Sequence, residues 1–149
     1  MEADYTPFMQ RAMRQAEAAF AQDEVPIGAV LLNEKLEIVA ETHNLVETAK
    51  DATAHAEMLA LREGFRITGQ KVLPEYTLVV TLEPCAMCAQ ALAWARVHTI
   101  VYGASDEKNG GLQSGANVAA HCLHKFDIHS GLMADKATKL MQDFFRAKR

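Results

Sequence analysis

Residue types that bind metal ions stand in two short, separate segments of this chain of 149 residues. His55 and Glu57 lie in the first segment, and Cys85 and Cys88 follow Pro84 in the second. Each segment is predicted to lie near the start of a helix, and Pro84 suits the first turn of the second helix. The cysteines are three residues apart, so both sulfur atoms would lie on one face of that turn. There the helix dipole favours the thiolate that binds metal.

The nature of a metal site at these residues follows from their chemistry. Sulfur together with imidazole suits zinc, and three ligands (His55, Cys85 and Cys88) would leave a fourth position open for water, as in catalytic sites. Two alternatives stay open: a thioredoxin-like redox pair, and a structural zinc site whose fourth ligand is the His, Cys or His of residues 121–124. Residues two apart point to different sides of a helix, so Glu57 is expected to reach the water rather than the ion.

The pattern of apolar residues predicts alternating helices and strands. Helical spacing predicts helices over residues 8–20, 55–65, 84–95 and 134–147. Short β-rich runs predict strands over residues 27–32, 37–40, 77–81, 99–102 and 126–129, the first two forming a hairpin. A Gly-rich loop over residues 103–115 is too long for a simple connection. These elements predict a single layered α/β domain over residues 1–149.

Composition limits the class of protein. With 50% apolar and 23% charged residues, the chain can bury a core and is not disordered. No apolar run approaches the roughly 18 residues that span a bilayer, and the acidic start is unlike a signal peptide. Three cysteines are too few for a disulfide framework. We therefore expect a cytoplasmic protein without a membrane partner.

The net charge of −4 gives no general argument for nucleic-acid binding, because such domains are usually basic. The charge is uneven, however, and the C-terminal segment is basic. This run is either the solvated face of a terminal helix or a basic docking edge; its members are Lys136, Lys139, Arg146, Lys148 and Arg149.

The two metal-binding segments together form the signature of zinc-dependent nucleobase deaminases. Several flanking segments resemble the bacterial tRNA adenosine deaminase subfamily, and the resemblance extends from Val25 to the end of the chain. Besides Asn44, these segments cover residues 25–30, 53–57, 81–88, 101–104 and 143–146.

The resemblance implies a fold, a cofactor and a reaction. The fold is a three-layer α/β/α cytidine deaminase-like fold with a central mixed sheet of about five strands. One Zn²⁺ per subunit would be held by His55, Cys85 and Cys88. Zinc-bound hydroxide would attack the base with Glu57 as the catalytic proton shuttle. The implied reaction converts adenosine to inosine at the wobble position of a tRNA anticodon loop.

The resemblance also implies how the substrate is bound. Asn44 would hydrogen-bond the base, since an amide both donates and accepts, and Asp106 and Lys108 would border the nucleic-acid strand. The partner would be a tRNA anticodon stem-loop, and the enzyme would be a homodimer. Trp94 is either a stacking platform for a base or part of the core or a subunit interface. Cys122 is expected to be a buried small side chain or a loop thiol.

Two other functions stay open. The chain departs from the subfamily pattern at Ala52, at Trp94 and over residues 109–115 and 121–124. These departures and the acidic net charge favour a deaminase of a free nucleobase or nucleoside, of the guanine or cytosine type. A non-catalytic zinc-binding module is the third alternative, although such a module has no use for Glu57.

Overall fold

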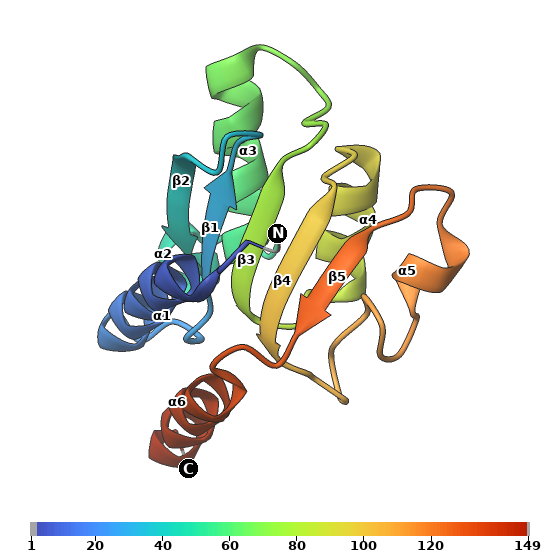
Figure 1. The fold of residues 1–149 in the computed structure, drawn as a ribbon. Helices are drawn as coiled ribbons and strands as arrows, with labels where there is room; N and C mark the ends of the chain where they lie inside the picture. Colours follow the sequence, from blue (N-terminus) through green and yellow to red (C-terminus); the bar gives the residue numbers. More distant parts are fainter. Residues whose placement is uncertain (1–2, 149) are drawn as a thin grey trace.

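The computed structural model describes residues 3–148 and contains a five-stranded mixed sheet (Figure 1). The strand order is β2-β1-β3-β4-β5, with β1 antiparallel to both β2 and β3, and with β3, β4 and β5 parallel. The strands are β1 (Gly28–Leu32), β2 (Ile38–His43), β3 (Thr77–Leu82), β4 (Thr99–Ala104) and β5 (Asp127–Ser130). The α/β class and the mixed sheet of five strands are confirmed.

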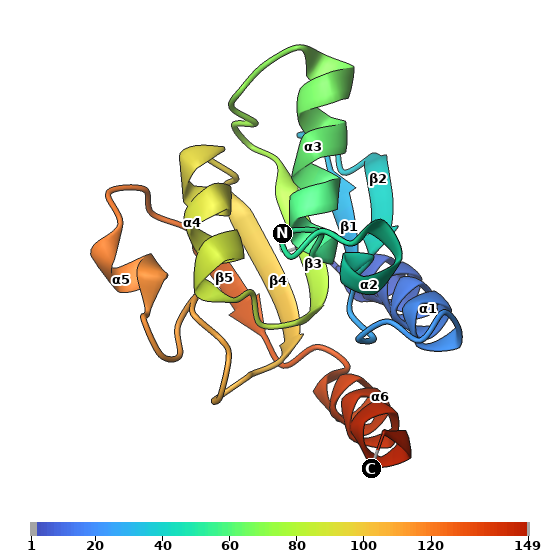
Figure 2. The same cartoon turned by 180° about the vertical axis from the view of Figure 1, so that it is seen from behind.

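Helices cover both faces of the sheet. On one face lie α1 (Thr6–Ala21) and α6 (Ala134–Ala147), and Figure 2 shows α3 (Ala56–Thr68) and α4 (Ala86–Trp94) side by side on the other. Two short helices complete the fold, α2 (Val46–Ala49) and α5 (Val118–His121). No helix of residues 3–148 is long and apolar enough to cross a bilayer.

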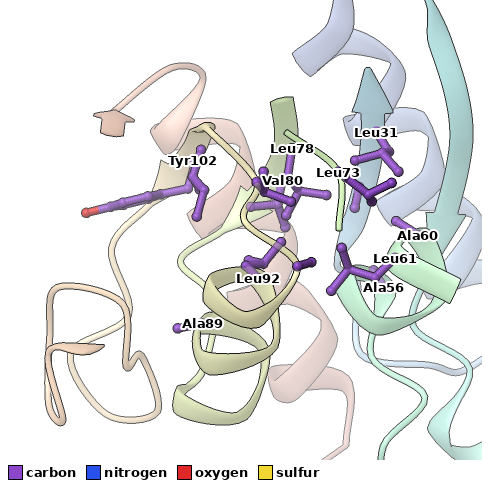
Figure 3. Close-up of a cluster of buried hydrophobic side chains, with 14 of the residues drawn as sticks. Leu31, Ala56, Ala60, Leu61, Leu73, Leu78, Val80, Ala89, Leu92 and Tyr102 are labelled. Carbon is purple, nitrogen blue, oxygen red and sulfur yellow. The ribbon is translucent and has the colours of Figure 1, made fainter. Parts of the chain in front are cut away.

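The core forms because the central strands are buried on both sides. Every residue of β1, β3 and β4 is buried, as expected for strands covered by helices on both faces. Alternate residues serve opposite layers: Leu31 and Leu78 pack toward α3 and α4 (Figure 3), whereas Val30 and Val79 pack against α1. This alternation fixes which face of the sheet carries α3 and α4.

Several element boundaries differ from the sequence prediction. β2 continues to His43, because it pairs along the whole of β1 up to Gly28. α3 continues to Thr68 and ends where Gly69 adopts a left-handed conformation with φ +67°. β4 includes Gly103 and Ala104, which the sequence pattern assigns to the following loop. β5 is an exposed edge strand shifted by one residue. The short α2 and α5 were missed, because four residues carry too little periodicity.

The start of α4 also differs from the prediction, and this difference affects the candidate site. Pro84 does not lie in the first turn: the helix begins at Ala86 and Cys85 is its N-cap residue. The Pro84 carbonyl instead accepts hydrogen bonds from the amides of Gly111 and Leu112, at 2.9 and 3.2 Å. The segment that carries the cysteines is thereby tied to the loop after β4.

Candidate metal and catalytic site

All segments around the candidate site meet at one end of the sheet, where several strands begin or end. The parallel strands β3 and β4 both end there, β2 ends there because it is antiparallel to β1, and β1 begins there. Loops at the carboxyl ends of parallel strands commonly form ligand sites in α/β proteins. His55, as the N-cap residue of α3, and Cys85, as the N-cap residue of α4, are brought together at this end.

His55, Cys85 and Cys88 form one compact group. The Nδ1 atom of His55 lies 3.5 Å from each of the two sulfur atoms, and the ligand atoms of all three residues lie within 4.8 Å of one another. Tetrahedral zinc with bonds of about 2.0 Å to nitrogen and 2.3 Å to sulfur places its ligand atoms about 3.6 Å apart. The spacing and the donor types therefore fit zinc.

The electrostatics of this group favour a cation. Hydrogen bonds, first with Cys88 and then with His55, lower the pKa of Cys85 to about 4 despite partial burial. Interaction with Cys85 and burial raise the pKa of Cys88, and a hydrogen bond with Cys85 raises the pKa of His55. The Cys85 thiolate is thus stabilised by the protons of Cys88 and His55, and a bound divalent cation would replace those protons.

Glu57 lies in the first turn of α3, beside the metal-binding group. It is 3% exposed, and its Oε1 atom has no hydrogen-bond partner within the described residues. Burial, together with the nearby Cys85 thiolate, raises the pKa of Glu57 to about 7, although a backbone hydrogen bond and His55 oppose the shift. A carboxyl group with a pKa near neutrality can both accept and donate a proton at physiological pH.

Asn44 follows the end of β2 and is also buried. Its Oδ1 atom and Glu57 Oε1 are the two buried side-chain polar atoms without a partner among residues 3–148. Both residues line the same cavity, which also contains His55 and Cys85. Because buried polar atoms are nearly always hydrogen-bonded, two unpaired ones in one cavity indicate a ligand-binding site.

The cavity has a volume of about 1530 Å³ and runs from the metal-binding group to α6. It exceeds the roughly 300–1,000 Å³ of sites for small ligands. Asp106 and Lys108 line it, as does Phe145 of α6, whose side chain is 47% exposed. Asp106 Oδ1 accepts the amides of Lys108 and Asn109 at 3.2 and 3.0 Å, so this carboxylate also shapes its own loop.

Several candidates lie outside this site. Trp94 does not line the cavity and is 76% exposed, so it is neither a core residue nor a stacking platform there. In the described part of the chain, no residue of 121–124 joins the metal-binding group. Cys122 donates to the His124 carbonyl at 3.0 Å, and His124 Nε2 contacts the Val97 carbonyl at 2.7 Å. The structural site with four ligands is therefore not supported.

The predicted basic edge is only partly free. Asp143 lies 2.7 Å from Lys139 and 3.9 Å from Arg146, and Lys148 pairs with Asp23 while lying 5.4 Å over the Phe144 ring. Arg146 and Lys148 line the cavity, whereas Lys136 lines a separate pocket and Arg149 lies outside the described residues. The basic residues therefore do not act as one surface.

Comparison with known proteins agrees with this geometry. Residues 2–104 match the family described as the cytidine and deoxycytidylate deaminase zinc-binding region. The chain belongs to this deaminase family. Zinc is the cofactor of the family, and the fit of the metal-binding group to zinc agrees with it.

Similar deaminases are found among curated relatives and solved structures. The chain is 42% identical to a tRNA-specific adenosine deaminase of Rickettsia bellii over 93% of this chain and 97% of the relative. It is 41% identical to one of Agrobacterium fabrum over 99% and 97%. A structure from a study of A-to-I editing by tRNA:A34 deaminases superposes with a TM-score of 0.88, at 40% identity, covering 91% of this chain and 99% of that one.

Proposed function

We propose that this protein is a zinc-dependent hydrolytic deaminase that converts adenosine to inosine at the wobble position of a tRNA anticodon loop, with residues 1–149 as one domain. The observation that carries the proposal is the cavity in which Glu57 Oε1 and Asn44 Oδ1 lack partners beside the metal-binding group. The similar tRNA-specific adenosine deaminases support the choice of substrate.

We assign the metal to His55, Cys85 and Cys88. A bound zinc ion lowers the pKa of water and so supplies a nucleophile at neutral pH. Glu57 accepts a proton from the attacking water and delivers it to the ring nitrogen N1 of adenine. After the C6–O bond has formed, Glu57 takes the second proton of the attacking water from the C6 hydroxyl and delivers it to the amino group N6. The C6–N6 bond then breaks, ammonia leaves and the C6 carbonyl of inosine forms. The pKa of about 7 suits Glu57 to both transfers.

Asn44 positions the base in this scheme. Its buried Oδ1 is an unused acceptor, and the amide nitrogen is a donor, so one side chain can match a purine edge that presents both kinds of group. Asp106 and Lys108 line the cavity further out, where nucleotides flanking a flipped base would pass. The size of the cavity favours an RNA segment over a free nucleobase.

We further propose a cytoplasmic homodimer. Trp94 at the end of α4 is 76% exposed, and Leu123 after α5 is fully exposed. Exposed large apolar side chains on neighbouring elements are typical of contact surfaces, and a second copy of this chain would bury them. A cytoplasmic location agrees with the free thiols of all three cysteines.

The proposed function can be tested on RNA. Zinc-loaded protein is incubated with an anticodon stem-loop that carries a single adenosine at the wobble position, and the RNA is digested and analysed for inosine. Inosine at that position supports the proposal. A matched stem-loop with the adenosine moved into the stem is the control, because a paired base must first be unstacked. Absence of inosine from the first RNA contradicts the proposal.

A further inference from the structure

Glu83 is a buried carboxylate that the proposed mechanism does not use. It follows β3, two residues before Cys85, and is 3% exposed. Its Oε1 accepts the Asp106 amide at 3.1 Å and the Ser114 hydroxyl at 2.8 Å. Its Oε2 accepts the amides of Gln113 and Ser114 at 2.9 and 2.8 Å. Four donors at both ends of the loop after β4 thus converge on one side chain.

Glu24 likewise is a buried carboxylate that accepts hydrogen bonds from a segment lining the cavity. It lies between α1 and β1 and is fully buried. Its Oε1 accepts the Glu47 amide at 3.0 Å, and its Oε2 accepts both the amide and the hydroxyl of Thr48 at 2.6 Å. Glu24 therefore holds α2, the element that directly follows Asn44.

Both carboxylates and both tethered segments line the cavity that contains the metal-binding group. On one side the loop held by Glu83 carries Asp106 and Lys108, and on the other α2 is held by Glu24. Both segments lie beyond the strand ends, and the loop also contacts the sheet through buried Leu112 and through Gln113, which accepts the Tyr102 hydroxyl at 2.6 Å. Within the described residues, Glu83 accepts four hydrogen bonds from the loop and Glu24 accepts three from α2, whereas the Pro84 carbonyl accepts two from the loop.

A carboxylate is required at these positions because all the partners are donors. An ionised carboxylate offers about four acceptor sites and no donor, whereas the isosteric amide of Gln has one accepting oxygen and points N–H groups at its neighbours. In either orientation, the Gln amide at position 83 would set its NH₂ group against at least one backbone amide. The expected result is displacement of the loop without loss of side-chain volume.

We propose that Glu83 and Glu24 are positioning residues for the substrate. Each holds one of the two segments that line the cavity and so fixes the distance between that segment and the reacting base. The proposal rests on the proposed function, because it concerns the substrate of that same site. Neither residue touches the reacting atoms in this scheme. Replacing either carboxylate should therefore weaken binding of the RNA in the reactive position more than it slows the chemical step.

The test compares Glu83→Gln and Glu24→Gln with Glu41→Gln in the zinc-loaded protein. Glu41 pairs with Arg11 at 2.7 Å on β2, away from the cavity, and undergoes the same loss of charge. KM and kcat are measured on the anticodon stem-loop, together with zinc content and hydrogen–deuterium exchange. We expect KM to rise about tenfold in the two cavity variants, kcat to change less than about threefold, and Glu41→Gln to resemble wild type.

Exchange adds a readout that does not depend on the substrate. Uptake should increase over residues 105–115 in Glu83→Gln only, and over residues 45–49 in Glu24→Gln only, while each variant keeps one zinc per chain. Faster exchange with unchanged KM would overturn the proposal. So would a fall in kcat with unchanged KM. If wild type makes no inosine, the proposed function fails, and exchange alone still decides whether the carboxylates hold the walls.

A second variant covers the case in which Glu83→Gln does not fold. A methyl group at Gly110 would come within 2.7 Å of Glu83 Oε1 and against the Asp106 carbonyl, so Gly110→Ala displaces the loop without altering the carboxylate. The same rise in KM with nearly constant kcat is expected. Wild-type KM in Gly110→Ala, with faster exchange over residues 105–115, would overturn the proposal.

Discussion

His55 Nδ1 lies 3.5 Å from Cys85 Sγ, and each residue is the N-cap of its helix. Two residues 30 positions apart meet because α3 and α4 pack side by side on one face of the sheet and begin at the same end. Both proposed ligands therefore lie at the positive ends of helix dipoles, which favours the thiolate form of Cys85. The metal site is thus a consequence of how the two helices are placed.

The metal site can be tested by paired cysteine variants. Cys88→Ala removes a buried residue of the proposed ligand set and should reduce bound zinc from one per chain to a small fraction. Cys122→Ala should keep full zinc content, because its sulfur bonds the His124 carbonyl and lies outside the metal-binding group. Elemental analysis of the purified variants measures both. Zinc loss from the Cys122 variant alone would mean that the ligands are wrongly assigned.

Glu57→Gln should abolish deamination while leaving the fold and zinc content intact. The amide keeps the volume of the buried side chain but cannot carry a proton between water and the base. Loss of a positioned acid–base group typically reduces the rate by about 10² to 10⁴. The rate of inosine formation under single-turnover conditions measures the loss. Turnover within a few-fold of wild type would exclude Glu57 as the proton shuttle.

Arg146 should contribute to RNA binding more than Lys139 does. Both flank Asp143 on α6, but only Arg146 lines the cavity, so Lys139→Ala is a matched control for Arg146→Ala. Each lost phosphate contact reduces the log–log dependence of binding on salt by about 0.7 for single strands. Binding of the stem-loop is measured between low and moderate salt. An equal salt dependence of binding for Arg146→Ala and wild type would show that Arg146 contacts no phosphate of the RNA.

Stability should depend on pH through Glu24. Burial alone would raise the pKa of Glu24, but hydrogen bonds from Thr48 and the Glu47 amide outweigh burial and lower it below 4.5. Because the pKa is lowered in the folded state, its contribution is present above pH 4.5 and is lost as pH falls through the folded pKa. Glu24→Gln should cost about 1–3 kcal/mol at pH 7.

The Glu24 prediction is measured by urea unfolding of both proteins in the same metal state. The difference in free energy of unfolding should be constant from pH 7 to about pH 5 and shrink below pH 4.5. A difference that stays the same in acid would show that the charge of Glu24 contributes nothing.

The proposed dimer predicts a specific effect at Trp94. Trp94→Lys places a charge in the contact surface and should convert dimer to monomer in sedimentation velocity. Ile38→Lys is the control, because Ile38 is 40% exposed on β2, at the opposite edge of the sheet from β5 and α5. A wild-type protein that sediments as a monomer at micromolar concentration would contradict the dimer.

Much of the fold and the metal-binding group could be predicted from the sequence. The buried strands are short β-rich runs and the long helices have apolar residues at helical spacing, and the spacing of Cys85 and Cys88 predicts two members of the group that the structure brings together. The meeting of His55 with the cysteines depends on helix packing, and the resemblance to deaminases supplied that relationship.

Other features depended on the tertiary structure. Glu24 follows α1 and Glu83 directly follows β3, and only the folded chain shows that distant amides converge on them. A lone Trp late in a helix leaves Trp94 as a stacking platform, a core residue or an interface residue, and only the structure shows that it is exposed at the end of α4. The basic run of α6 could not be resolved into paired and cavity-lining residues without Asp143 and Asp23 in place.

Deamination rates on RNA and on free bases test the central claim most directly. Zinc-loaded protein is assayed for ammonia release from adenine, guanine, cytosine and cytidine, and for inosine in an anticodon stem-loop with a wobble adenosine. We predict efficient inosine formation in the RNA and little ammonia from any free compound, because the cavity extends from Glu57 to Arg146 on α6. Rapid release of ammonia from guanine or cytosine with no inosine in the RNA would contradict this prediction.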